Sequence, residues 1–155
     1  MSVYVTTTKI KKEWTDYNEH MNMSYYVLIF DLAWEIILEK FKMGEHSAKT
    51  TKKSTMVVET HTTYNNEVKQ DEEVEIFLTH FDYDKKRLHF KLEMYEKVKK
   101  NLSATIEMIS LYIDLKQRKV AEFEEEKSKI MDEFVNKNKS EFSLDNLVFS
   151  GKLKK

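Results

Sequence analysis

The sequence predicts an α+β fold in which one long helix packs against a curved antiparallel β-sheet. Three observations support this prediction: a long apolar helical segment follows an N-terminal strand, a series of strand-like segments follows that helix, and short polar turns join strands that therefore run antiparallel. The chain has 155 residues, of which 41% are apolar, and this is enough for one domain with one core.

The N-terminal part of the chain supplies a strand and the helix. Residues 2–12 are rich in Val, Thr and Tyr, which is typical of a strand. A helix is predicted over residues 23–43, because Asn22 or Ser24 suits its N-cap and Gly44 suits the position just past its end. Its polar side chains form one narrow stripe made of Asp31, Glu35, Glu39 and Lys42. Because the rest of the helix surface is apolar, we expect a sheet to wrap around the helix and largely enclose it.

The remainder of the chain supplies that sheet. Strands are predicted at residues 54–68, 72–81, 87–95 and 102–115, where apolar and polar side chains alternate or β-branched residues dominate. The polar segments 82–86 and 96–101 are predicted to be hairpin connections. An amphipathic helix follows within residues 122–138, with Ile130, Met131 and Phe134 on its apolar side.

The predicted domain organisation is a single domain over residues 1–138, followed by a tail or arm over residues 139–155. Within that last part, "LDNLVF" (144–149) fits either a short strand or an arm laid on a partner subunit. The basic end "SGKLKK" is expected to be solvated.

Composition excludes several classes of function. Lys and Arg number 26 and Asp and Glu 27, and this balance argues against a nucleic-acid partner. The absence of Cys excludes disulfides, thiolate metal sites and a cysteine nucleophile, and it fits a cytoplasmic location. No signal peptide is expected at the N-terminus, and charges within the longest apolar segment argue against a membrane span.

Most of the usual chemical motifs are missing from the sequence. There is no glycine-rich phosphate loop and no Gly-x-Ser-x-Gly elbow. Glu59 and His61 share one face of a strand, but without a third ligand they predict a surface or interface pair rather than a metal site. The scattered His46, His80 and His89 are expected to be solvated. We therefore predict no metal site and no cofactor.

One polar stretch, "WTDYNEHMNMSYY" (14–26), stands directly before the long helix. It places Asp16, Asn18, His20 and Asn22 between a strand and a helix N-terminus. The simplest interpretation is a capping loop in which Asn22 satisfies free amide groups. The alternative is a reaction centre, because a helix N-terminus offers unpaired N–H groups and a positive dipole end that suit an oxyanion, while a nearby carboxylate attacks or activates water.

This stretch and the segment "FDLAWE" that follows resemble the Asp-x-Asn-Gly-His-Met/Val-Asn signature of hotdog-fold acyl-CoA thioesterases, the 4-hydroxybenzoyl-CoA thioesterase family. "VVETHTTYNNEVKQDE", "DKKRLHFKLEMY" and "LSATIEMISLYIDLKQRKVAEF" follow in the order and spacing of that family. The resemblance covers about residues 3 to 137 and is greatest to the branch that includes betainyl-CoA thioesterases of carnitine breakdown. It implies a hotdog fold, in which an antiparallel sheet wraps a long central helix.

The resemblance also implies roles for particular residues. Asp16 matches the family's catalytic carboxylate, a nucleophile or general base, and His20 and Asn22 match the residues that close the loop and begin the helix. Asn18, Tyr26, Glu59 and His61 are the candidate residues of the substrate pocket.

The chain departs from the family's pattern at Glu19, where the family has Gly. If this position requires a positive φ, Glu is strained there, and it adds a second carboxylate near Asp16.

The function that follows is hydrolysis of a short or polar acyl-CoA to CoA and a free acid, with CoA present only as part of the substrate. The family pairs two sheets edge to edge and places its active sites at that interface, so a homodimer or dimer of dimers is expected, with residues 54–66 as the paired edge. A non-catalytic hotdog that binds acyl-CoA, or a purely structural dimer, is the alternative. Dehydration of a hydroxyacyl thioester ranks lower, because the corresponding motif is not found.

Overall fold

The computed structural model describes residues 2–155, so Met1, the first residue of the predicted domain, lies outside the described part. The strands are β1 (Val3–Lys9), β2 (Lys53–Tyr64), β3 (Glu73–Tyr83), β4 (Arg87–Glu96), β5 (Leu102–Asp114) and β6 (Lys119–Val120). The α-helices are α1 (Met23–Lys40), α2 (Glu45–Thr50) and α3 (Glu125–Asn138), and short 3-10 turns cover Lys12–Trp14 and Lys139–Glu141. The predicted α+β class is confirmed.

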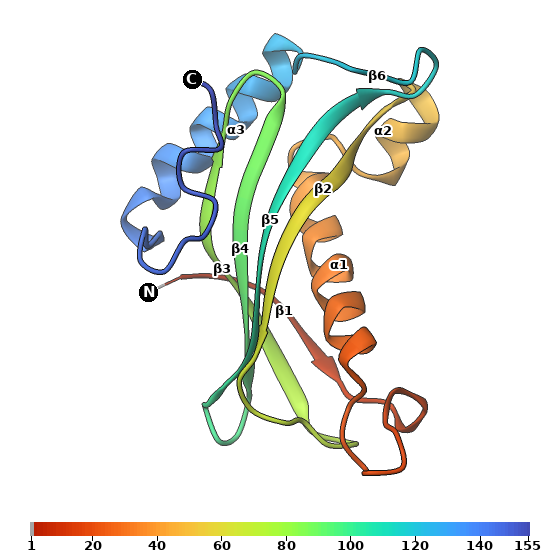
Figure 1. Ribbon diagram of the computed structural model, residues 1–155. Coiled ribbons are helices and arrows are strands. Elements are labelled where there is room, and N and C mark those ends of the chain that lie inside the picture. The colour runs from red at the N-terminus through yellow and green to blue at the C-terminus, as the bar shows by residue number, and fades with distance from the viewer. Residues whose placement is uncertain (1) are drawn as a thin grey trace.

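The sheet is antiparallel and strongly curved (Figure 1). Its strand order is β1-β3-β4-β5-β2, and β6 pairs with the end of β5. The predicted hairpins between β3 and β4 and between β4 and β5 are confirmed. Strand β2 is an edge strand with one side unpaired among residues 2–155, which agrees with the predicted exposed edge.

Helix α1 lies along one side of the sheet, and its buried side supplies much of the core. Trp34 stacks on Phe90 of β4 with ring centroids 3.4 Å apart, and Ala33 and Ile37 are fully buried. The prediction that the helix is largely enclosed is wrong within one chain, because Leu28, Leu32 and Ile36 are 38%, 55% and 40% exposed. The sheet covers only one side of the helix.

Gly44 serves a different purpose from the predicted one. Helix α1 ends at Lys40, and Gly44 is the N-cap of α2, a short helix that the sequence analysis missed. A Cβ atom on Gly44 would lie 2.0 Å from the carboxylate end of the Glu39 side chain, which would have to move to make room for it.

Helix α3 lies alongside β3 and packs against the same core as the end of α1, whereas the residues after it cover the face of the sheet that is turned away from α1 (Figure 1). Met131 of α3 is fully buried, and Phe134 packs edge-on against Phe41 and Phe81 at 5.1 and 5.8 Å. We call residues 143–155 the C-terminal segment. "LDNLVF" within it forms no strand in the described part of the chain and lies on its own sheet.

The C-terminal segment is held by carboxylates of the sheet. Glu107 is 1% exposed and accepts hydrogen bonds from the amides of Val148 and Phe149 at 2.7 and 2.8 Å. Glu107 also pairs with His89 Nε2 at 2.7 Å. The expectation that His80 and His89 are solvated is therefore wrong, because this segment covers them and leaves them 6% and 4% exposed. None of the helices formed by residues 2–155 is both long and apolar enough to cross a membrane.

Candidate active site

The loop before α1 is a tight, hydrogen-bonded turn. The Glu19 amide donates to the Asp16 carbonyl at 3.0 Å, and the Asp16 amide donates to the His20 carbonyl at 3.1 Å. Thr15 and Met21 form an antiparallel bridge that closes the turn. The loop is also fixed to α1, because the Asn22 amide donates to the Trp14 carbonyl at 2.9 Å.

This turn requires a positive φ at the residue where the family pattern has glycine. Glu19 has φ of 66°, in the left-handed region that costs an L-residue about 1–2 kcal/mol. The departure at Glu19 is thus a real source of backbone strain in the loop that carries Asp16. The Glu19 side chain itself is exposed.

Asp16 is half-buried, and one of its carboxylate oxygens stabilises the turn. Its Oδ1 accepts a hydrogen bond from the Asn18 amide at 2.9 Å, the geometry of an Asx turn. This bond fixes the orientation of the carboxylate relative to the loop. Asn18 itself is exposed, so its side chain lies on the open side of the turn.

The N-terminus of α1 retains hydrogen-bonding capacity next to this loop. Asn22 is the N-cap, as predicted: its Oδ1 accepts from the Ser24 amide at 3.0 Å, and its carbonyl accepts from the Tyr25 amide. First-turn amides have no acceptor inside a helix, and the Met23 amide stands at the first helical position. The positive end of the helix dipole acts in the same place.

His20 connects the loop to the segment that follows β2. Its Nε2 lies 3.0 Å from Glu67 Oε2, and its backbone forms a bridge with Lys69. The Met21 amide donates to the Val68 carbonyl at 2.7 Å. His20 therefore positions the loop by contact with residues 67–69 and does not face Asp16 as an acid–base partner in any hydrogen bond of the described chain.

Tyr26 forms the wall of a pocket beside this helix end. The side chain is 4% exposed, and its hydroxyl oxygen accepts from the Val68 amide at 3.2 Å. Burial raises the pKa of Tyr26 above its ordinary value. The pocket measures about 270 Å³ and is lined by Met21, Met23, Tyr26, Tyr64, Asn65, Asn66 and Glu67.

Asn65, Asn66 and Glu67 were missed as pocket residues by the sequence analysis. They lie 39 or more positions after Tyr26 in the chain and carry no local motif. The antiparallel pairing of β2 with β5 brings them to the start of α1, and a single sequence gives no signal of that pairing partner.

Glu59 and His61 lie elsewhere in the chain. They stand opposite Ile109 and Glu107 of β5, on the face of the sheet that carries the C-terminal segment. Glu59 pairs with Lys152 at 3.5 Å. His61 lines a separate polar pocket of about 260 Å³ together with Thr105 and Glu107. Within one chain the structure does not bring these two residues together with Asp16, although both lie on the edge strand β2.

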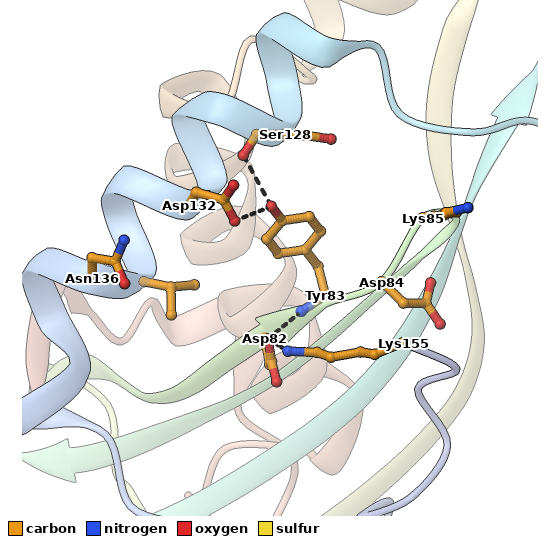
Figure 2. Close-up of a pocket in the computed structure, with 9 residues that line it drawn as sticks. Asp82, Tyr83, Asp84, Lys85, Ser128, Asp132, Asn136 and Lys155 are labelled. Atoms are coloured by element: carbon orange, nitrogen blue, oxygen red, sulfur yellow. Dashed lines mark hydrogen bonds and ion pairs between the residues drawn. The ribbon is translucent and has the colours of Figure 1, made fainter.

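Chemical alternatives to the loop are few in the described part of the chain. Within residues 2–155, no three His, Asp or Glu side chains are placed to hold one metal ion. A larger pocket, about 500 Å³, lies between the end of β3, α3 and the C-terminal segment (Figure 2). Its carboxylates are already engaged: Asp132 accepts a hydrogen bond from the Tyr83 hydroxyl, and Asp84 pairs with Arg87 at 2.9 Å.

The fold defines the class of protein. A long helix held against a curved antiparallel sheet, with a capping loop at the helix N-terminus, is the hotdog fold. A hypothetical protein from Staphylococcus aureus, whose structure was determined in complex with CoA, superposes with a TM-score of 0.82 at 22% identity, over 95% of this chain and 90% of that one. A 1,4-dihydroxy-2-naphthoyl-CoA thioesterase from Synechocystis superposes with a TM-score of 0.74 at 13% identity, over 83% of this chain and 95% of that one.

The sequence identifies the family. Residues 10–134 match the thioesterase-like superfamily, and the chain belongs to this family. A betainyl-CoA thioesterase from Pseudomonas aeruginosa is 29% identical over 128 residues, which cover 81% of this chain and 80% of that protein. An L-carnitine dehydrogenase/betainyl-CoA thioesterase from Rhizobium meliloti is 28% identical over 72% of this chain, but the match spans only 22% of that protein. Both relatives are named thioesterases, so this chain is a thioesterase-type enzyme by family.

Proposed function

We propose that this protein is an acyl-CoA thioesterase that hydrolyses a short or polar acyl-CoA to CoA and a free acid. The observation that carries the proposal is the position of Asp16. Its half-buried carboxylate is oriented by the Asn18 amide in a turn that is hydrogen-bonded to the start of α1. Family membership supports the same reaction class.

The geometry supports a direct mechanism. The thioester carbonyl oxygen approaches the first-turn amides of α1, where the Met23 N–H and the helix dipole stabilise the negative charge that develops on that oxygen. Asp16 either attacks the carbonyl carbon or removes a proton from the attacking water. The carbon–sulfur bond then breaks, the thiolate of CoA leaves and takes up a proton, and water supplies the hydroxyl group of the acid.

The pocket next to Tyr26 supports the substrate class. Its volume of about 270 Å³ is small for a ligand site, and the amides of Asn65 and Asn66 and the carboxylate of Glu67 line it beside two tyrosines. Such a lining favours a compact acyl group with polar or cationic atoms over a long alkyl chain. Aromatic faces beside a carboxylate are suited to a cationic group in particular.

Self-association is part of the same proposal. Large apolar side chains are exposed in two neighbouring places, on α1 (Met23, Val27, Leu28, Leu32 and Ile36) and on β2 (Met56, Val57, Val58 and Tyr64). Exposed apolar side chains beside an unpaired strand edge favour a partner that covers both the helix surface and the strand edge. Pairing of β2 with β2 of a second copy would cover these side chains and would place Glu59 and His61 at the subunit boundary.

A panel of acyl-CoAs tests the function. Thiol release is followed with acetyl-, betainyl-, benzoyl- and palmitoyl-CoA, and melting temperatures are measured with CoA alone. We expect turnover with the small polar substrates and little with palmitoyl-CoA. The strained Glu19, with φ of 66°, favours the alternative of a binding protein. Thermal stabilisation by CoA without thiol release from any substrate would establish that alternative and contradict the enzymatic proposal.

A further inference from the structure

A second cavity lies away from the candidate active site, between the end of β3, α3 and the C-terminal segment. It measures about 380 Å³, within the range of small-molecule sites. Phe81 of β3, Val135 of α3 and Phe142 form an apolar wall, and Lys139 and Asn136 add polar groups. It adjoins the cavity of Figure 2, with which it shares Asp82, Val135, Asn136 and Lys155.

His80 lines this cavity and lacks a partner. The side chain is 6% exposed, and its Nδ1 is buried without a hydrogen bond among residues 2–155. Its neighbour His89, with a ring centroid 4.8 Å away, is by contrast paired with Glu107 at 2.7 Å. A buried polar group without a partner costs stability, and the fold carries that cost at Nδ1 of His80.

The protonation state of His80 fixes which chemistry it offers. Burial, with the nearby His89 as a smaller cause, lowers the pKa of His80 to about 4, and the charges of Asp82, Glu107 and Lys155 act on it too. The ring is therefore neutral near pH 7. Because an orphaned N–H is rarer than an orphaned lone pair, the lone pair belongs on the buried Nδ1 and the N–H donor on Nε2.

The charges around the cavity favour an anion. Lys155 and Lys139 line it, and Asp82 is the one acidic residue among the lining side chains. Lys155 is paired with Asp82 at 2.7 Å, whereas Lys139 takes part in no ion pair formed among residues 2–155. One positive charge, unpaired among residues 2–155, and a neutral imidazole thus line a cavity whose wall is otherwise largely apolar.

We propose that this cavity binds a small monocarboxylic acid with an apolar body. Its carboxylate would lie between Lys139 and the Nε2–H of His80, and its body against Phe81, Val135 and Phe142. Because the C-terminal segment provides part of the lining through Leu144 and Lys155, a bound acid would also hold that segment on the sheet.

Hexanoate is the probe that tests the site. NMR titration of the full-length protein follows the His80 imidazole and the Leu144 amide, and hydrogen exchange follows the Ser143 amide, which donates to the Thr79 carbonyl. We expect saturable shifts at both reporters and slower exchange at Ser143. Hexan-1-ol and hexylamine share the apolar body but lack the negative charge, and we expect both to bind more weakly.

Three variants separate the site from general surface effects. His80→Phe removes a hydrogen bond to a charged ligand, so we expect it to bind hexanoate at least roughly tenfold more weakly. The NMR shift of the Leu144 amide measures this binding. Loss of one exposed ionic contact predicts about two- to fivefold weaker binding in Lys139→Gln. Lys137→Gln, on the same helix but outside the cavity lining, serves as the matched control and should bind normally.

Several outcomes overturn the proposal. These are the absence of saturable shifts at His80, binding of hexylamine as tight as that of hexanoate, or equal losses in Lys139→Gln and Lys137→Gln. The surface variants keep the test decisive even if His80→Phe fails to fold.

Discussion

The two sides of the sheet differ in how completely their polar groups are hydrogen-bonded and their apolar side chains are buried. On the face that carries the C-terminal segment, Glu107 is 1% exposed and its carboxylate has three hydrogen-bond partners. On the α1 side, Asp16 is half-buried with one backbone donor, and Leu32 is 55% exposed. A carboxylate whose lone pairs are all engaged stabilises structure, whereas one with free capacity is available for chemistry. The α1 side is therefore the one on which we propose that substrate and a second subunit bind.

Removal of Glu107 should have the largest effect on stability. Glu107→Ala leaves the Val148 and Phe149 amides and the buried His89 without their partner, and loss of one member of a buried pair costs about 3–5 kcal/mol. Urea unfolding measures this loss. Glu59→Ala removes an exposed carboxylate paired with Lys152 and should cost less than about 1 kcal/mol. Equal losses in the two variants would contradict the account of Glu107 as a buried, hydrogen-bonded carboxylate that stabilises the fold.

A charge on the exposed side of α1 should prevent self-association. Leu32→Lys would bury an unpaired ammonium group in the proposed interface, which costs several kcal/mol, so we expect the dissociation constant of the dimer to rise at least about a hundredfold. Analytical ultracentrifugation measures it. Val98→Lys changes another exposed apolar residue, 84% exposed in the turn after β4, and should leave the dimer intact. A dimer that survives Leu32→Lys would place the interface elsewhere.

Acid should lower the free energy of unfolding of the protein through His80. The folded pKa of His80 is about 4, below the ordinary value of 6.5. As pH falls below 6.5 the unfolded chain therefore binds a proton that the folded chain does not, and the free energy of unfolding decreases. This contribution amounts to about 2 kcal/mol between pH 7 and pH 5. Urea unfolding at both pH values should show a smaller decrease in His80→Phe than in His46→Phe, whose histidine is exposed. An identical pH dependence in both variants would contradict a buried neutral His80.

Relief of strain at Glu19 should have the smallest effect. With φ of 66°, Glu19→Gly should stabilise the fold by about 1 kcal/mol, because glycine adopts this conformation without the cost of a Cβ atom. Thermal unfolding measures the gain. Asn18→Gly, in the same turn but without a positive φ, should bring no gain. Destabilisation by Glu19→Gly would show that the glutamate side chain contributes a contact that outweighs the strain.

Regular alternation made the sheet predictable from sequence. Leu88, Phe90, Leu92 and Met94 alternate along β4 and all four are fully buried, as the period-2 pattern predicted. The capping role of Asn22 was predictable because it depends on neighbours in sequence. The positive φ expected at residue 19 came from the family pattern and is present in the structure.

The errors have a common physical cause, which is contact between residues far apart in the chain. His80 and His89 are buried because residues 142–149 cover them, more than fifty positions later. Gly44 approaches the Glu39 side chain and caps α2, and it does not end α1. The exposed side of α1 looked like core in the sequence, because the same apolar pattern predicts burial by a sheet or by a second subunit.

The central claim is that Asp16, at the N-terminus of α1, performs the hydrolysis. It is tested most directly by thiol release from the best acyl-CoA with Asp16→Asn, beside Asp31→Asn as a matched control on the exposed part of α1. Loss of the reacting carboxylate should lower kcat by about 10²- to 10⁴-fold with the melting temperature nearly unchanged, while Asp31→Asn keeps wild-type turnover. Wild-type turnover in a folded Asp16→Asn variant would contradict the claim.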